Sequence, residues 1–390
     1  MSTSSITQSL SQVPQALLDL EVKERSNVFA WRGQFSPELV EVLLKTYARE
    51  GDIVFDPFAG VGTTLLEAAK QGMRSRGTEL NPSAFLMAQS VEWVRYSPKQ
   101  RESFISVANE LMGKALFDQS GASPFAEVNI KEQARKLASL ARESALDSEV
   151  KQILANTLIR AMGNDSDFRK AFRQHCQILR SLPVLSTSHR MFHADARATP
   201  LTPESVDLVL TSPPYINVFN YHENNRQAME MLGWDILSIA QAELGSNRKN
   251  RGNRFLTVIQ YCLDMQAVLV ELKRVLKRTG KILFIVGRES MVRGVPFQNG
   301  ELVASLAEIS GFRVTLRQDR KFLNRFGQNI IEDILYLEQS NTDTLGDARR
   351  VAITMLSEKA KLQLQDGVRF DLEEAIRNAV NVLPSPLYGR

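Results

Sequence analysis

The sequence predicts an α/β protein with a mostly parallel twisted sheet, a helical insertion and a helical C-terminal tail. Strand-like and helix-like segments alternate with short connections between residues 35 and 79, which is typical of a parallel sheet covered by helices. Strand-like segments then stop and resume near Arg190, and the stretch between them follows a helical period. We therefore expect a flexible N-terminus at residues 1–26 and a main domain in two parts, residues 27–96 and residues 190–340. A helical insertion at residues 97–189 separates the two parts, and a helical tail follows at residues 341–390.

The first part of the main domain is expected to begin with a helix over residues 35–47. Ser36 is the expected N-cap, and Pro37 stands at the first helical position, where its missing N–H costs no hydrogen bond. A β-α-β unit follows. Its first strand is expected at residues 52–58, its glycine turn at 60–62, its helix at 63–72 and its second strand at 73–79.

The second part of the main domain is expected to add further strands after the one near Arg190. Apolar, β-branched segments of strand length predict them at residues 205–210, 281–287, 312–318 and 331–338. A long amphipathic helix is expected over residues 255–277, ending at Gly280, and a shorter one from Glu301 to Gly311, because glycine commonly closes a helix. Two more helical stretches follow Ser340.

Composition excludes several classes of protein. Of the 390 residues, 43% are hydrophobic and 24% are charged, which suits a globular chain with a sizeable core. No apolar run approaches the roughly 18 residues of a membrane span, and the first residues lack an apolar leader segment. We therefore expect a cytoplasmic protein. The formal net charge of +4 permits a polyanionic partner without requiring one.

Cysteine and histidine are too few to predict a metal site or a disulfide framework. The chain has two cysteines, Cys176 and Cys262, and four histidines. His189 and His193 stand four residues apart, but no third ligand lies near them in the sequence, so we expect no metal.

A first group of polar residues points to a nucleoside-containing cofactor. The segment from Asp56 to Thr64 places Gly60 and Gly62 where a strand turns into a helix, so that the backbone can approach a ligand and helix N–H groups face it. Glu79 ends the next strand, where an acidic residue can accept hydrogen bonds from ribose hydroxyls. The two glycines alone would also fit a tight turn without a ligand. No Gly-Lys-Ser/Thr follows, which excludes a P-loop.

A second group, Thr211-Ser-Pro-Pro-Tyr215, directly follows an expected strand. The carboxyl end of a parallel strand is where open α/β sheets bind ligands. Ser212 offers a hydroxyl acceptor for an exocyclic amine, the rigid prolines hold a carbonyl as a second acceptor, and Tyr215 offers a face for a planar base. The alternative is a rigid strand-ending loop in which Tyr215 is part of the core.

The segments DPFAGVGTT, GTELNP and TSPPY together resemble the amino-group DNA methyltransferases that use S-adenosyl-L-methionine. The resemblance implies a Rossmann-like methyltransferase fold and a double-stranded DNA substrate. TSPPY is similar to the branch that methylates N4 of cytosine, whereas the N6-adenine branch more often has Asp or Asn in place of Ser212. The cofactor motif precedes TSPPY here, which resembles a circularly permuted order.

The resemblance also implies roles for individual residues. Ser212, Pro213, Pro214 and Tyr215 would be catalytic and would hold the target amine. Glu79 would bind the ribose hydroxyls, Asp195 the adenine amine, and the glycine turn the methionyl part of the cofactor. The full set implied to bind S-adenosyl-L-methionine is Phe35, Asp56, Phe58, Gly60, Gly62, Thr63, Glu79, Asn81, Asp195 and Ala196.

DNA contacts are predicted from charge and position. The segment from Ser246 to Arg254 carries four cations and no acid, so it is either a solvated loop or a phosphate-contacting one. The helical insertion is a candidate for target recognition. The residues expected to contact nucleic acid are Asn217, Tyr221, Arg248, Lys249, Arg251 and Arg254.

Alternatives to the N4-cytosine enzyme remain open at the level of the sequence. They are an N6-adenine DNA methyltransferase, an RNA N2-guanine or protein glutamine methyltransferase, and a non-catalytic DNA-binding scaffold. Ser212 disfavours the RNA and protein enzymes, in which Asn or Asp more usually precedes Pro-Pro-Tyr. An enzyme of a restriction-modification or related system would have a cognate restriction endonuclease as partner.

Overall fold

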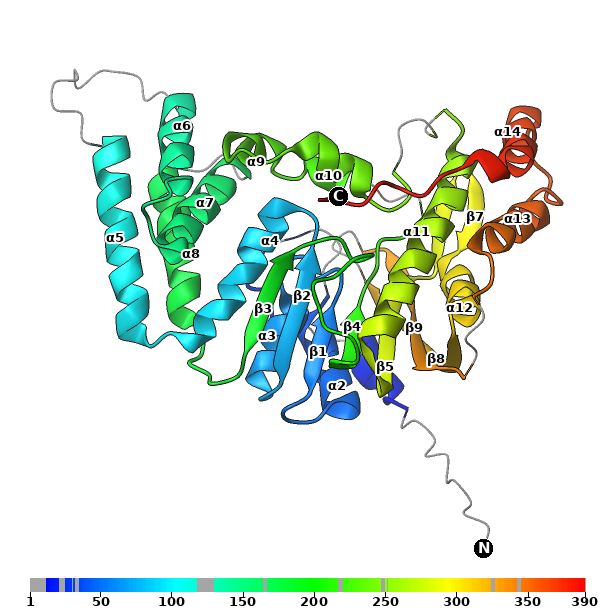
Figure 1. The fold of residues 1–390 in the computed structure, drawn as a ribbon, viewed down its shortest axis with the longest axis horizontal. Helices are drawn as coiled ribbons and strands as arrows, with labels where there is room; N and C mark the ends of the chain where they lie inside the picture. Colours follow the sequence, from blue (N-terminus) through cyan, green and yellow to red (C-terminus); the bar gives the residue numbers. More distant parts are fainter. Residues whose placement is uncertain are drawn as a thin grey trace, which may run out of the picture.

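A computed structural model describes most of the chain as a central sheet enclosed by helices (Figure 1). The seven strands of the sheet follow the order β3-β2-β1-β4-β5-β9-β8, and β6 pairs separately with β7. The residues that the structure describes are 12–20, 25–29, 31, 35–117, 130–163, 167–216, 220–246, 250, 252–323, 327–341 and 345–389.

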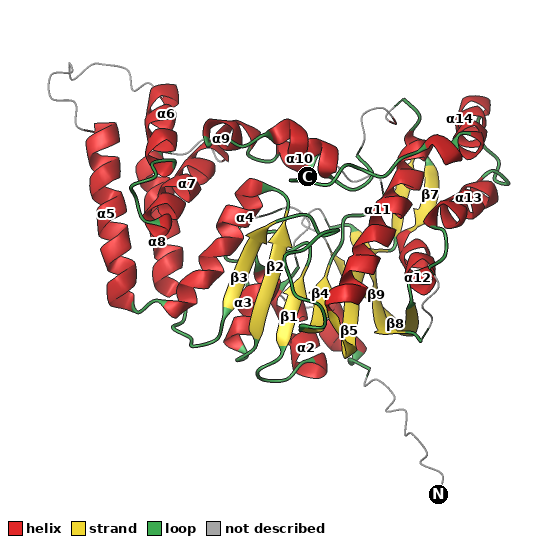
Figure 2. Ribbon diagram, in the orientation of Figure 1, coloured by secondary structure: helices red, strands yellow, loops and turns green. Residues whose placement is uncertain are grey.

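The sheet is parallel from β3 to β5 and antiparallel beyond, so the expected fold class is confirmed. Figure 2 shows its strands side by side with helices on both faces. The strand order reverses at β1, which pairs with β2 on one side and with β4 on the other. The bounds are β1 Ile53–Asp56, β2 Arg74–Glu79, β3 His189–His193, β4 Val206–Thr211, β5 Leu276–Gly287, β8 Phe312–Leu323 and β9 Asn329–Gln339.

One face of the sheet is covered by α1 (Gln15–Asp19), α2 (Pro37–Tyr47) and α3 (Thr63–Lys70). Val54 of β1 packs there in one core cluster with Leu39 of α2 and Ala68 of α3. The helix α2 begins as expected, because the Ser36 side chain accepts from the N–H of Leu39 and Pro37 takes the first position. The expectation of a flexible end over residues 1–26 is wrong for α1, whose Leu18 is fully buried.

The opposite face is covered by helices from the second half of the chain. Phe55 and Phe284 of the sheet pack there with α11 in the largest core cluster. Among the described residues α11 alone is long and apolar enough to cross a membrane, but 72% of its most apolar window is buried inside the protein. The helices of this layer are α11 Arg254–Val275, α12 Asn299–Ile309, α13 Ala348–Lys359 and α14 Asp366–Arg377, followed by the short η4 Ala379–Asn381.

Helices make up most of the described part of residues 97–189, the predicted helical insertion, whose last residue, His189, already begins β3. Its helices share a core cluster that includes Leu154 and Phe172, and α7 also contacts α4 beside the sheet. The helices of this region are α5 Pro98–Phe117, α6 Ile130–Ala141, α7 Ser148–Gly163 and α8 Phe168–Ser181, and α4 Pro82–Ala88 and η1 Gln89–Arg95 precede it.

Three features of the fold differ from the expectations. The long helix ends at Val275 rather than near Gly280, because Leu276 becomes extended and pairs with Val206 as the start of β5. A hairpin of β6 (Glu289–Val292) and β7 (Val295–Gln298) follows β5. The short elements η2 Tyr221–Glu223, α9 Arg226–Met231 and α10 Ile236–Ala242 follow the TSPPY segment.

Candidate active site at the carboxyl ends of the parallel strands

A cavity of about 1080 Å³, part of it open to solvent, lies at the carboxyl ends of β1, β2 and β4. This is the switch point of the strand order, where open α/β sheets bind ligands. The cavity brings together residues of both sequence motifs. Those of the expected set that line it are Phe35, Asp56, Phe58, Gly60, Thr63, Glu79, Asn81, Asp195, Ala196, Ser212 and Pro214.

The two glycines of the turn have different roles. Gly60 lines the cavity with a φ of +51°, and its N–H donates to Glu79. Gly62 does not line this cavity. A Cβ on Gly62 would lie 3.1 Å from Ala88, so this glycine allows α3 and α4 to approach closely rather than facing a ligand.

Glu79 is held by the backbone of both neighbouring loops. Its two carboxylate oxygens accept from the N–H of Gly60 and from the N–H of Asn81, each at 2.8 Å. Burial raises the pKa of Glu79 to about 7, although both of these hydrogen bonds oppose the rise. The carboxylate can accept further hydrogen bonds from a ligand in the cavity, because two backbone donors use only part of its four acceptor sites.

Asp56 is a second carboxylate in the wall of the cavity, and it is buried. It accepts a hydrogen bond of 2.6 Å from Thr211, the last residue of β4, and another from the N–H of Phe58. Burial raises the pKa of Asp56 to about 6. A site with two such carboxylates favours a cationic ligand, since a positive charge would stabilise their ionised forms.

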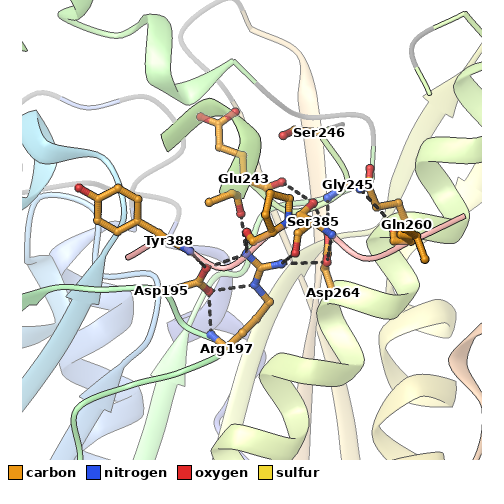
Figure 3. A network of polar contacts seen from close by, with 12 residues as sticks. Asp195, Arg197, Glu243, Gly245, Ser246, Gln260, Asp264, Ser385 and Tyr388 are labelled. Carbon is orange, nitrogen blue, oxygen red and sulfur yellow. Dashed lines mark hydrogen bonds and ion pairs between the residues drawn. The ribbon is translucent and has the colours of Figure 1, made fainter. Parts of the chain in front are cut away.

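Asp195 lines the cavity, but other protein groups already occupy its carboxylate (Figure 3). Its Oδ1 accepts from the N–H and Nε of Arg197, and its Oδ2 accepts from another guanidinium nitrogen of Arg197 and from the N–H of Tyr388. All four acceptor sites of the carboxylate therefore have a donor. The adenine contact of Asp195 stays a prediction, and an adenine amine would have to share one of these oxygens.

The C-terminal segment supports Asp195 and Arg197 from behind, although none of its described residues lines the cavity. The Arg197 guanidinium donates to the carbonyls of Ser385 and Pro386 and to Asp264 of α11. The Tyr388 ring lies edge-on to His193, which is the last residue of β3, with ring centroids 4.9 Å apart. Figure 3 shows this segment crossing beside Asp195. Residues that are distant in the sequence therefore fix the expected adenine end of the cavity.

The TSPPY segment reaches the cavity through only two of its residues. Ser212 and Pro214 line the cavity, whereas Pro213 and Tyr215 do not. The phenol of Tyr261 in α11 donates to the Pro214 carbonyl at 2.9 Å, which holds the loop against the core. The Tyr215 ring packs so closely over Gly287 that a Cβ there would lie 2.9 Å from the ring.

Several wall residues were not expected from the sequence. Trp31, Ile239, Glu243 and Leu244 complete the cavity. Glu243 accepts from the N–H and the ring of His222, and so ties the end of α10 to the loop after TSPPY. No local motif marks these residues, because Ile239, Glu243 and Leu244 reach the cavity through the packing of α10 and Trp31 through that of the segment before α2.

Of the six predicted DNA contacts, Tyr221 and Arg254 lie within the described residues. Tyr221 lines the cavity, and its carbonyl accepts from the Asn81 side chain at 2.7 Å. Arg254 is the first residue of α11. The other four, Asn217, Arg248, Lys249 and Arg251, lie outside the described residues. The roles of all six in DNA binding stay predictions.

Comparison with known proteins supports the resemblance seen in the sequence. A family model described as a DNA methylase, of the N6/N4 type, matches residues 14–90. The type II methyltransferase M.MjaII of Methanocaldococcus jannaschii is 39% identical over 74 residues, which span 18% of this chain and 14% of that protein. The type II methyltransferase M.AvaI of a Nostoc strain is 22% identical over 389 residues, covering 73% of this chain and 78% of that protein.

Among solved structures, a S-adenosylmethionine-dependent methyltransferase from Methanosarcina mazei gives a TM-score of 0.35 at 11% identity, covering 78% of this chain and 98% of that chain. The family match contains the glycine turn and Glu79, two features on which the sequence resemblance was based. The matches to the family model and to the type II enzymes together support an amino-group DNA methyltransferase that uses S-adenosyl-L-methionine.

Proposed function

We propose that the protein moves a methyl group from S-adenosyl-L-methionine to the N4 amine of a cytosine flipped out of double-stranded DNA. The observation that carries the proposal is the meeting of Asp56, Glu79 and Ser212 at one cavity. A cofactor held between the first two residues and an amine held at the third would share that space. Reaction by direct transfer then needs no nucleophilic side chain, only correct placement of the two reactants.

The residues at the cavity suit this cofactor. Gly60 leaves room for a ligand near the backbone, and Glu79 can accept hydrogen bonds from ribose hydroxyls. Asp56 is a buried carboxylate and Glu79 a half-buried one, both with a raised pKa, so they favour a cation, and the cofactor carries a positive sulfur. When bound, S-adenosyl-L-methionine supplies a methyl group made electrophilic by that sulfur.

The TSPPY segment would hold the amine for attack. Ser212 and a carbonyl of the Pro-Pro pair accept hydrogen bonds from the amine N–H groups, which favours a pyramidal nitrogen with its lone pair aimed at the methyl group. Removing a base from the duplex costs a few kcal/mol, and stacking on an aromatic ring such as Tyr215 offsets about 1–3 kcal/mol of it. The side chain of Ser212 is the reason for choosing cytosine over adenine.

Sequencing with detection of modified bases tests the proposal. Genomic DNA from a strain that expresses the protein should carry N4-methylcytosine within one short sequence context. The Ser212→Ala variant should leave the DNA unmethylated while binding S-adenosylhomocysteine with nearly normal affinity in calorimetry. N6-methyladenine in place of N4-methylcytosine would correct the choice of base, and methylation of RNA or protein without DNA would overturn the proposal.

The biological setting that we propose is a restriction-modification or related system in the cytoplasm. A cognate restriction endonuclease would then cut the same DNA sequence when it lacks the methyl group. Digestion of the modified genomic DNA with nucleases that are blocked by methylation of that sequence would identify the specificity.

A further inference from the structure

The hydroxyl of Ser212 carries a hydrogen that the carboxylate of an Asp at the same position would lack. A serine hydroxyl both donates and accepts hydrogen bonds, whereas the target amine, with its N–H groups, needs an acceptor. Some other group must therefore take the hydroxyl hydrogen of Ser212. Among the described residues, the Tyr215 hydroxyl is the hydrogen-bond partner of Ser212, and the two oxygens lie 3.3 Å apart.

A carboxylate stands on the far side of the Tyr215 hydroxyl. Glu332 of β9 accepts from the Tyr215 O–H at 3.5 Å. Both distances are long for hydrogen bonds donated by a hydroxyl, as is common in catalytic sites without substrate. Ser212, Tyr215 and Glu332 thus form a row of three oxygen-bearing groups that begins at the cavity wall.

The sheet fixes Glu332 in this position from both sides. Its backbone pairs with Gly287 of β5, over which the Tyr215 ring packs, and with Arg320 of β8. The Nε of Arg320 donates to one carboxylate oxygen of Glu332 at 2.8 Å, which leaves the other oxygen facing Tyr215. The side chains of Arg320 and Glu332 are only 5% and 15% exposed, so water competes little for these contacts.

The direction of the hydrogen bonds follows from the number of hydrogens. Tyr215 has one hydroxyl hydrogen, and it points to Glu332 because a carboxylate paired with Arg320 can only accept. Burial, with a further contribution from the charge of Glu332, raises the pKa of Tyr215, so the phenol keeps this hydrogen. Ser212 must then donate its own hydrogen to the Tyr215 oxygen, which leaves its lone pairs for the amine.

We propose that Glu332 is a positioning residue of the methyl transfer, which orients the hydroxyls of Tyr215 and Ser212 so that Ser212 acts only as an acceptor. The proposal rests on the proposed function of the TSPPY segment. It extends the site to a strand that carries no recognised motif and lies 117 residues from Tyr215 in the sequence.

A double-mutant cycle with Glu332→Gln and Tyr215→Phe tests the proposal. Each single variant should lower kcat on duplex DNA about tenfold, the effect expected from losing one hydrogen bond to a charged group. The KM for DNA and the calorimetric affinity for S-adenosylhomocysteine should stay within about twofold of the wild type. The double variant should be no slower than Tyr215→Phe alone, because either change already breaks the row.

The control is Glu338→Gln on the same strand. Glu338 pairs with Arg313 across β8 and β9 as Glu332 pairs with Arg320, but at the other end of the strands. This variant should keep the wild-type kcat. Suppose that the wild-type enzyme methylates DNA. The proposal would then be overturned if the two losses of kcat multiplied in the double variant, or if Glu338→Gln lost as much kcat as Glu332→Gln. A wild-type protein that methylates no DNA would overturn the proposed function as well.

Discussion

Arg197 donates hydrogen bonds to both carboxylate oxygens of Asp195, and this ion pair is buried. The guanidinium donates from Nε to Oδ1 at 2.9 Å and from a terminal nitrogen to Oδ2 at 2.6 Å. Both side chains are at most 3% exposed. The same guanidinium also pairs with Asp264 at 2.9 Å, so a single cation joins the end of β3 to α11 and to the C-terminal segment.

Replacement of Arg197 should therefore be strongly destabilising. Arg197→Ala leaves two buried carboxylates without their cation, and breaking a buried pair in this way costs about 3–5 kcal/mol. We expect this loss in the free energy of unfolding measured by urea denaturation. Arg180→Ala is the matched control, because Arg180 pairs with Glu102 on the surface and both side chains are about half exposed; its loss should stay below about 1 kcal/mol. Equal losses in the two variants would contradict the buried network.

Glu79 should make the stability of the ligand-free protein depend on pH. Its pKa is raised from 4.5 to about 7 in the folded protein, so between these values the folded chain holds a proton that the unfolded chain has released. The free energy of unfolding should therefore fall as pH rises from about 4.5 to about 7, and this contribution should level off above that range. Thermal melting across pH 5–8 should show a drop of a few degrees that is smaller in Glu79→Gln. A steeper drop in the variant would contradict the raised pKa.

Gly62 should tolerate a side chain less well than a glycine of similar backbone conformation. Gly62 and Gly51 have φ values of +86° and +84°, but a Cβ on Gly51 would meet nothing within 4 Å, whereas one on Gly62 would press on Ala88 and Val91. Gly51→Ala should cost about 1–2 kcal/mol from the left-handed conformation alone. Gly62→Ala should cost clearly more in the same denaturation experiment. Equal costs would mean that α3 and α4 can separate without penalty.

The sequence was sufficient to place both motifs at one edge of the sheet. Asp56 and Glu79 lie near the carboxyl ends of two predicted strands and Ser212 follows a third, and the carboxyl ends of parallel strands meet at the same edge. Ser36 and Pro37 likewise predicted the start of α2 through local hydrogen bonding. These predictions succeeded because the physical signal lies within a few residues of the element that it describes.

The remaining parts of the site depend on long-range contacts and could not be predicted in the same way. Arg197 meets Pro386 across 189 positions of the chain, and Glu332 meets Tyr215 across 117. An isolated arginine or glutamate gives no sign of such a partner. The C-terminal end of α11 was also predicted wrongly. Leu276 is apolar enough for either a helix or a buried strand, and its pairing with Val206 makes it the first residue of β5.

Gly287 should be required for activity rather than for cofactor binding. A Cβ at this position would lie 2.9 Å from the Tyr215 ring, so Gly287→Ala must displace the ring that the target base is expected to contact. We expect kcat on duplex DNA to fall at least tenfold, since small displacements of positioning groups are costly, while affinity for S-adenosylhomocysteine stays near that of the wild type.

Gly346→Ala is the control for Gly287→Ala. A Cβ on Gly346 would lie 2.7 Å from Ile309, so this variant meets a comparable clash in a part of the protein away from the cavity. It should lower the melting temperature without lowering kcat at a temperature where the protein is folded. If both variants lose stability and neither loses kcat, the Tyr215 ring can shift without consequence, and its predicted contact with the target base would be wrong.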